Sequence, residues 1–242
     1  MRVPRIFTDQ PLQPGSRVQL DARAHRYVSQ VLRLRVGQHL ILFNGNGSDF
    51  DATLSHCGRK GCSADVLAAV STGRPAALQV HLGIAVSRGE RMDFALQKAV
   101  ELGVESLTPL FSERSVVKLG AQRLERRFSH WRGIVISACE QSGRHHLPDL
   151  RPCASLPDWL AAHQGGLMLY HRATQSLADL PPPSRSALNL LIGPEGGLSE
   201  SERALAFANG FVAVRLGPRI LRTETAPIAA LAAIQVLWGD FR

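Results

Sequence analysis

The chain has 242 residues, of which 45% are hydrophobic, so it can bury the core of one large or two small domains, and global disorder is excluded. The formal net charge is +8, and 28 residues are lysine or arginine. A basic protein of this size typically binds a polyanion, most often nucleic acid. Only three of the basic residues are lysines, so genome composition is an alternative source of the arginine bias.

Two features of the sequence indicate where the protein acts. The N-terminal segment MRVPRIF lacks the apolar stretch of a signal peptide. The longest apolar run, residues 226–238, is interrupted by Gln235 and is too short to span a bilayer. We therefore expect a cytoplasmic protein without a membrane partner.

The cysteine pattern contains no metal-binding motif. No pair has Cys-x-x-Cys spacing, and no histidine pair has zinc-finger spacing; His145 and His146 are adjacent and are expected to be solvated. We expect free thiols and no metal. The cysteines are Cys57, Cys62, Cys139 and Cys153.

The first 72 residues indicate a β-rich unit. Asp21 is a candidate N-cap for a helix over 22–34, and a turn at Gly37 leads into a strand. Asn44–Gly47 predicts a turn between that strand and the next. The region has nine Lys or Arg, five Asp and no Glu. A small β-barrel with a basic binding face is one interpretation, and a merely solvated basic surface is the other. The two further strands are expected at 49–56 and 62–70.

A linker is predicted at residues 71–76, and strands and helices alternate after it. Such alternation predicts a largely parallel sheet with helices on its faces. Lys98 and Glu101, three residues apart, are expected to pair on one helix. The expected strands are 79–86, 106–111, 166–170, 188–192 and 211–216, and the expected helices are 91–102, 121–139, 200–208 and 225–237.

Two strand ends carry unusual residues. LLIGPEGGLSESE (190–202) places three glycines after an apolar strand, and Ser199 with Glu202 fits a capping box. LGPRILRTETA (216–226) places two arginines, a carboxylate and two threonines before an apolar helix. Ligands bind at strand ends in parallel sheets, although a glycine-rich loop is also often only a turn. The first loop fits neither the P-loop nor the dinucleotide fingerprint.

These two motifs, with SRGERMDFALQKAVELGV (87–104) and ACEQSGRHHLP (138–148), resemble the ribosomal RNA small subunit methyltransferase E family of the SPOUT superfamily. The resemblance covers essentially the whole chain. It implies a PUA-like RNA-binding β-barrel over 1–72 and an α/β SPOUT domain with a deep trefoil knot over 73–242. It also implies a homodimer.

The family activity implied by the resemblance is methyl transfer from S-adenosylmethionine to N3 of one uridine in 16S rRNA of the small ribosomal subunit. The cofactor would lie in three loops, 169–172, 192–197 and 216–225. The implied cofactor-binding residues are Leu169, His171, Ile192, Gly193, Pro194, Gly196, Gly197, Leu216, Gly217, Ile220, Leu221, Thr223 and Thr225.

The polar residues of the second loop suggest roles in that reaction. Uracil N3 holds a proton at neutral pH, so its methylation requires proton removal or stabilisation of an anion. We expect Arg222 to stabilise the anion and Glu224 to act as general base. The structural alternatives are a salt bridge between Arg219 and Glu224 and a helix cap at Thr225, which would leave Pro227 in the first turn.

Basic and amide side chains elsewhere are candidates for RNA contacts. Two other functions also fit the sequence: a non-catalytic RNA-binding assembly factor, and a SPOUT methyltransferase with another RNA specificity. The candidate RNA-binding residues are Arg5, Arg88, Arg91, Gln141, Arg144 and Arg219.

Overall fold

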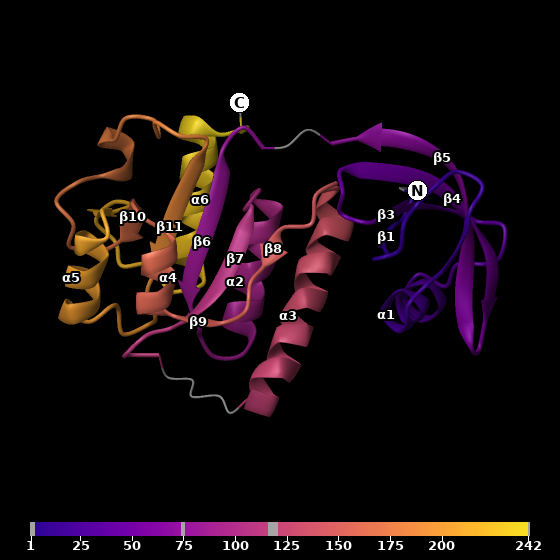
Figure 1. The fold of residues 1–242 in the computed structure, drawn as a ribbon, viewed down its shortest axis with the longest axis horizontal. Helices are drawn as coiled ribbons and strands as arrows, with labels where there is room; N and C mark the ends of the chain where they lie inside the picture. The colour runs from indigo at the N-terminus through magenta and orange to yellow at the C-terminus, as the bar shows by residue number, and fades with distance from the viewer. Residues whose placement is uncertain (1–2, 74–75, 116–120, 242) are drawn as a thin grey trace. The chain divides into compact units, whose positions relative to one another are not determined.

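The computed structural model describes residues 3–73, 76–115 and 121–241 (Figure 1). The chain divides into two compact units. Met1–Pro75 and Ile136–Leu147 form the first unit, and Ala76–Val135 and Pro148–Arg242 form the second. The expected linker at 71–76 lies partly outside the described residues. The domain boundary between 72 and 73 stays a prediction.

The first unit is a five-stranded sheet in the order β1-β3-β4-β5-β2. Strand β1 runs parallel to β3, and the other pairs are antiparallel. Three register shifts between β4 and β5 allow the long hairpin to bend around the apolar core. The strands are β1 (Arg5–Phe7), β2 (Arg17–Gln19), β3 (His39–Phe43), β4 (Ser48–Gly58) and β5 (Gly61–Thr72).

The helix expected at 22–34 is shorter and less regular than predicted. Asp21 is the N-cap as expected, because its side chain accepts a hydrogen bond from Ala24 N at 2.6 Å. Helix α1 (Ala22–Arg26) then continues as a π-helical turn, Tyr27–Val31. Arg33 has a φ of +53°, a left-handed conformation that helices do not continue through.

A buried ion pair joins the start of the sheet to the end of helix α3 (Ala121–Ser142). The Arg5 guanidinium donates to both carboxylate oxygens of Asp49, at 2.9 and 2.7 Å. It also donates to the carbonyl oxygens of Cys139 and Arg144. Arg5 therefore donates four hydrogen bonds within the first unit, and its side chain is only 7% exposed. Because the guanidinium is buried and fully bonded, Arg5 has a structural role in place of the predicted RNA contact.

The carboxylate of Glu140 makes a second buried connection. It accepts hydrogen bonds from Phe7 N at 2.9 Å and from the guanidinium of Arg23 at 2.8 and 3.1 Å. The end of α3 therefore supplies acceptors that the first unit uses. Gly143, with a φ of +81°, follows the helix as expected of a C-terminal glycine.

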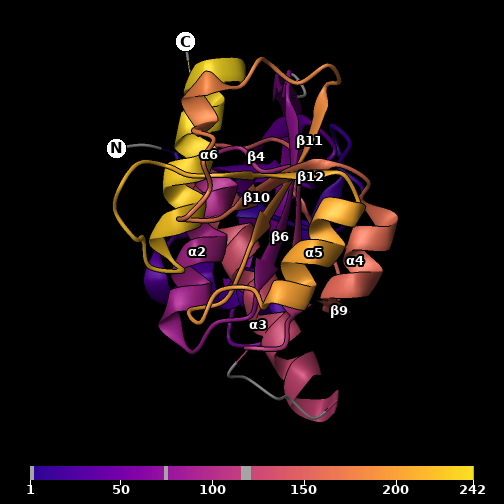
Figure 2. The ribbon, with the colours of Figure 1, turned by 90° about the vertical axis from the view of Figure 1, so that its left-hand side faces the viewer.

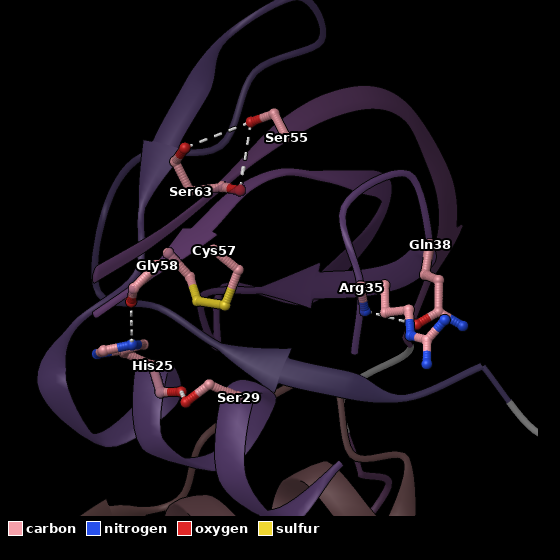
Figure 3. Close-up of a disulfide and its surroundings, with 9 residues drawn as sticks. His25, Ser29, Arg35, Gln38, Ser55, Cys57, Gly58 and Ser63 are labelled. Atoms are coloured by element: carbon pink, nitrogen blue, oxygen red, sulfur yellow. Dashed lines mark hydrogen bonds between the residues drawn. A yellow bond between two sulfur atoms is a disulfide. The ribbon is translucent and has the colours of Figure 1, made fainter. Parts of the chain in front are cut away.

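The expectation of four free thiols is wrong for two of them. Cys57 and Cys62 form a disulfide at the end of the β4–β5 hairpin, where they face each other across the two strands (Figure 3). Motif spacing did not reveal this pair, because strand register and not a metal motif brings the two residues together. Cys139 and Cys153 are free, as expected.

The second unit is a parallel sheet in the order β12-β10-β11-β6-β7-β8, with β9 also paired to β7. Helices α2 and α6 lie on one side of the strands, and α4 and α5 lie on the other (Figure 2). The strands are β6 (Gln79–Ala85), β7 (Ser106–Phe111), β8 (Asp149–Leu150), β9 (Ala154–Ser155), β10 (Gly166–Leu169), β11 (Ala187–Ile192) and β12 (Phe211–Val214). The helices are α2 (Glu90–Glu101), α4 (Leu156–Ala162), α5 (Glu200–Ala208) and α6 (Thr225–Trp238), with a 3-10 turn at Leu177–Asp179.

This strand order confirms the expected parallel α/β fold. The chain crosses back over the sheet after β9, and β11 then inserts between β10 and β6. The loops after β10, β11 and β12 consequently leave the same edge of the sheet. Strand order alone does not establish threading, so the trefoil knot stays a prediction.

The apolar run near the C-terminus forms α6. The helix begins at Thr225, with Glu224 at the N-cap position, so the predicted N-cap at Thr225 is wrong by one residue. Pro227 lies in the first turn, where its missing N–H removes no helical hydrogen bond. In the part of the chain that the structure describes, no helix combines the length and apolarity needed to cross a membrane.

The buried pair between Arg5 and Asp49 should contribute strongly to stability. Asp49→Asn leaves the buried guanidinium without its counter-charge, and we expect a loss of about 3–5 kcal/mol in the free energy of unfolding. Urea denaturation followed by circular dichroism measures the loss. The matched control is Asp65→Asn, which removes the exposed pair with Arg17 and should barely move the midpoint. Equal shifts in the two variants would contradict the assignment.

Candidate functional site

A cavity of about 810 Å³ lies at the carboxyl ends of β10, β11 and β12. We call it the strand-end cavity. Its floor includes buried apolar strand residues, and its rim is formed by the three loops that follow these strands. Apolar walls with a few polar groups, in this range of volumes, are typical of a small-molecule site. The lining residues include Leu169, Ile192, Gly193, Gly196, Leu216, Leu221, Arg222, Thr223 and Glu224.

The loop after β11 is shaped by its glycines. Gly197 has a φ of +67°, and its N–H donates to Pro194 O at 2.8 Å to close a turn. At Gly193 a Cβ would lie 3.0 Å from Leu198 Cγ, so only glycine fits without a shift. The two glycines therefore allow the loop to turn tightly where it lines the cavity.

A buried carboxylate fixes the end of this loop. Ser199 and Glu202 form the predicted capping box at the start of α5. The second oxygen of Glu202 accepts from Glu113 N at 2.8 Å, in the segment that follows β7. Hydrogen bonds from Ser199 and Ser201 lower the pKa of the neighbouring Glu113 carboxyl.

Arg114 holds the same loop from the other side. Its guanidinium donates to Gly196 O at 3.0 Å, and Arg114 itself lines the cavity. The sequence reasoning missed this residue. The signal was available, because Arg114 closely follows a parallel strand that ends at Phe111, on the edge where ligands bind.

Several other cavity residues were also missed, and some of them have structural roles. Arg203 donates to Leu198 O and lies over the ring of Tyr170 at 5.0 Å, and Arg215 donates to Ala173 O. Glu195 pairs with Arg91 at 3.5 Å. These contacts order the loops around the cavity. Tyr170, Arg172 and Glu195 lie within the predicted loops 169–172 and 192–197, and the remaining lining residues not predicted are Met168, Leu198, Val214 and Ala226.

Arg219 and Arg222 are exposed side chains on the rim. Within the described residues, neither side chain forms a hydrogen bond or an ion pair. The structural alternative of a salt bridge between Arg219 and Glu224 is therefore not formed. Two unpaired guanidinium groups beside a cavity favour an anionic ligand or a ligand that becomes anionic.

Glu224 is the most informative residue of the cavity. One of its carboxylate oxygens is buried and has no hydrogen-bond partner in the described part of the chain. A buried acceptor without a donor is costly, so such atoms commonly mark ligand sites. Glu224 lines the strand-end cavity, where a bound molecule can supply the missing donor.

The structure brings most of the predicted site residues together. Every predicted cofactor-binding residue lines the strand-end cavity except Thr225, which is exposed at the start of α6. Both predicted catalytic residues, Arg222 and Glu224, also line it. Of the predicted RNA contacts, Arg91 and Arg219 line the cavity, whereas Arg88 is exposed after β6 and does not. Gln141 and Arg144 belong to the first unit.

Comparisons with known proteins identify both units. Residues 74–235 match the RNA methyltransferase domain family, and residues 20–67 match the RNA methyltransferase PUA domain family. A ribosomal RNA small subunit methyltransferase E from Buchnera aphidicola is 34% identical over 99% of this chain and 98% of that protein.

Two solved structures are similar over their full length. A methyltransferase from Legionella pneumophila, in complex with the bound cofactor SAM, is 37% identical, with a TM-score of 0.95. A ribosomal RNA small subunit methyltransferase E from Neisseria gonorrhoeae, bound to S-adenosyl methionine, is 40% identical, with a TM-score of 0.91. Each comparison covers 100% of both chains. With a cavity at the predicted strand ends and full-length similarity to these proteins, this chain belongs to the ribosomal RNA small subunit methyltransferase E family of RNA methyltransferases.

Proposed function

We propose that this chain transfers the methyl group of S-adenosylmethionine to N3 of a uridine in 16S rRNA. The observation that carries the proposal is the strand-end cavity, which combines apolar walls, two unpaired rim arginines and the unpartnered buried oxygen of Glu224. Full-length relatives with the corresponding name and bound cofactor support the reaction class.

The residues of the cavity fit S-adenosylmethionine. Its volume is large enough for a nucleoside with an amino-acid tail, and Leu169, Ile192 and Leu216 provide apolar surface for it. The glycine-shaped loop presents backbone groups that can bond a polar ligand. When bound, the cofactor supplies an electrophilic methyl group for in-line displacement.

The two predicted catalytic residues have complementary tasks. The unpartnered oxygen of Glu224 is a suitable acceptor for an N–H group, and uracil N3–H is such a donor. Glu224 would take this proton as the nitrogen becomes nucleophilic. Arg222 would stabilise the negative charge that develops on the uracil ring. The loops would hold the reacting atoms in line, and this positioning would make the main contribution to the rate of the displacement.

Recognition of the RNA would rest mainly on basic side chains. Arg219 and Arg91 line the cavity, and Arg88, three residues before Arg91 in the sequence, is exposed to solvent. Gln141 and Arg144 would contribute from the first unit. We further propose that the protein acts as a homodimer in the cytoplasm, on the RNA of the small ribosomal subunit. Contacts to phosphates make such binding dependent on salt.

The activity can be tested in cells that lack the gene. We expect 3-methyluridine to disappear from small-subunit rRNA and to return when the wild-type gene is restored, as measured by nucleoside mass spectrometry. A different missing nucleoside would indicate another RNA specificity. Unchanged nucleosides together with an assembly defect would favour a non-catalytic factor.

The two roles can be separated in a purified reaction. Glu224→Gln keeps the shape of the side chain and removes the base, so we expect the rate at saturating cofactor to fall by about a hundredfold or more. Arg222→Ala should lower the rate by a similar factor. Cofactor affinity should change little in either variant. Glu200→Gln and Arg185→Ala are exposed controls in the same unit. Rates equal to those of the controls would refute the assignments.

Arg114 should act through the loop that it holds. Arg114→Ala removes the hydrogen bond to Gly196 O, and we expect the Kd for S-adenosylmethionine to rise about tenfold, equivalent to ~1.4 kcal/mol. The rate at saturating cofactor should stay within a few fold of wild type. Isothermal titration calorimetry and initial rates measure the two effects, with the exposed Arg126→Ala as control. A lowered rate with an unchanged Kd would contradict a positioning role.

A further inference from the structure

Three metal-ligating side chains meet at the end of the β4–β5 hairpin, in the first unit. One ligand atom each from His25, Cys57 and Cys62 lies within 4.8 Å of the other two. Cys62 is fully buried, and the other two residues are partly buried. None of the three belongs to the strand-end cavity, and the reaction proposed above does not use them.

Local structure brings the three residues together and keeps them there. The β4–β5 register places Cys57 opposite Cys62. Leu20 N donates to Cys62 O at 2.9 Å, which anchors the start of α1 beside this pair. Asp21 caps α1, so His25 follows one helical turn later and lies beside the disulfide (Figure 3).

The oxidised and reduced states of the pair differ in what they can bind. In the disulfide the two sulfurs are bonded to each other and carry no thiolate charge, so neither is a metal-binding thiolate. A tetrahedral zinc ion with Zn–S bonds of 2.3 Å requires two thiolates about 3.8 Å apart. Breaking the S–S bond lets the sulfurs move to van der Waals separation, which is close to that value. Because the β4–β5 register also places the two residues opposite each other, reduction frees two neighbouring thiols beside His25.

The histidine has the hydrogen bond typical of a metal ligand. His25 Nε2 lies 3.0 Å from Gly58 O, and a carbonyl oxygen only accepts, so this nitrogen donates. In the neutral ring the lone pair is then on Nδ1. Metal-binding histidines commonly donate their other N–H to a carbonyl group. Binding through Nδ1 would keep this hydrogen bond, and binding through Nε2 would replace it.

We propose that Cys57, Cys62 and His25 form a redox-controlled binding site for a thiophilic divalent cation, with zinc as the best match. Two molecules of a low-molecular-weight thiol reduce the protein disulfide to two thiols and are themselves oxidised to one disulfide. The cation then binds two thiolates and one imidazole with release of two protons, and water fills the fourth position. The bound ion would join the hairpin end, which carries Arg59 and Lys60, to helix α1.

The other two cysteines provide internal controls. Burial raises the pKa of both the Cys139 and the Cys153 thiol to about 11, so neither is a ready thiolate at neutral pH. Within the described residues, neither belongs to a group of three potential ligands. A Cys139→Ser/Cys153→Ser double variant should therefore bind the cation like the wild-type chain.

The experiment uses the full chain without an affinity tag, either reduced with a phosphine and freed of metal or oxidised. Zn²⁺ affinity is measured by competition with a chromogenic chelator, and Co²⁺ reports thiolate ligation through its charge-transfer absorption. We expect the reduced chain to bind one equivalent and the oxidised chain to bind none. Cys57→Ser and Cys62→Ser should lose stoichiometric binding, and His25→Gln should weaken it by at least about tenfold.

Three results would overturn the proposal. These are no Zn²⁺ binding by the reduced wild-type chain at micromolar concentrations, equal binding by the oxidised chain, and loss of binding in the double variant. Retained affinity in His25→Gln would remove the histidine from the site. Because the oxidised and reduced wild-type chains share one sequence, their comparison does not depend on whether any variant folds. Circular dichroism of each variant checks the fold.

Discussion

The site depends on one topological constraint, which is that parallel strands end at a common edge. Strands β10, β11 and β12 are adjacent in the sheet although they are separated along the chain, so their three following loops emerge side by side. The backbone groups of these loops have left the sheet ladder and need other partners. Arg114 and Glu202 supply some of them, and turns within the loops supply others, such as the bond from Gly197 N to Pro194 O.

Charge is used differently in the two units. In the first unit, Arg5 and Arg23 form ion pairs with the buried carboxylates of Asp49 and Glu140. A high density of basic residues therefore does not by itself produce a basic face. In the second unit, Arg219 and Arg222 remain unpaired at the cavity rim within the described residues. Net charge therefore predicts a polyanionic partner, but the geometry decides which arginines can reach it.

Most of the second unit could be predicted from sequence, because its longer strands are short apolar runs, whereas helix α4 and the two-residue strands β8 and β9 were not predicted. The capping box of Ser199 and Glu202 is an example in which a local rule is sufficient. The resemblance supplied the cofactor-binding residues, and all of them except Thr225 line the cavity. Residues that depend on distant contacts could not be predicted. Cys57 meets Cys62 only through strand register, whereas the place of Arg114 just after β7 was a signal that could have been used.

The first unit is built from two separate segments of the chain, and this has a consequence for biosynthesis. Arg5 and Phe7 need acceptors on Cys139, Glu140 and Arg144, which the ribosome adds more than 130 residues later. When the N-terminal sheet leaves the ribosome, the Arg5 guanidinium therefore has Asp49 as a partner but lacks its carbonyl acceptors on Cys139 and Arg144. The sheet can complete these hydrogen bonds only after more than half of the chain has been synthesised. This chain thus cannot complete its first unit before residues 76–135 of its second unit have also been synthesised.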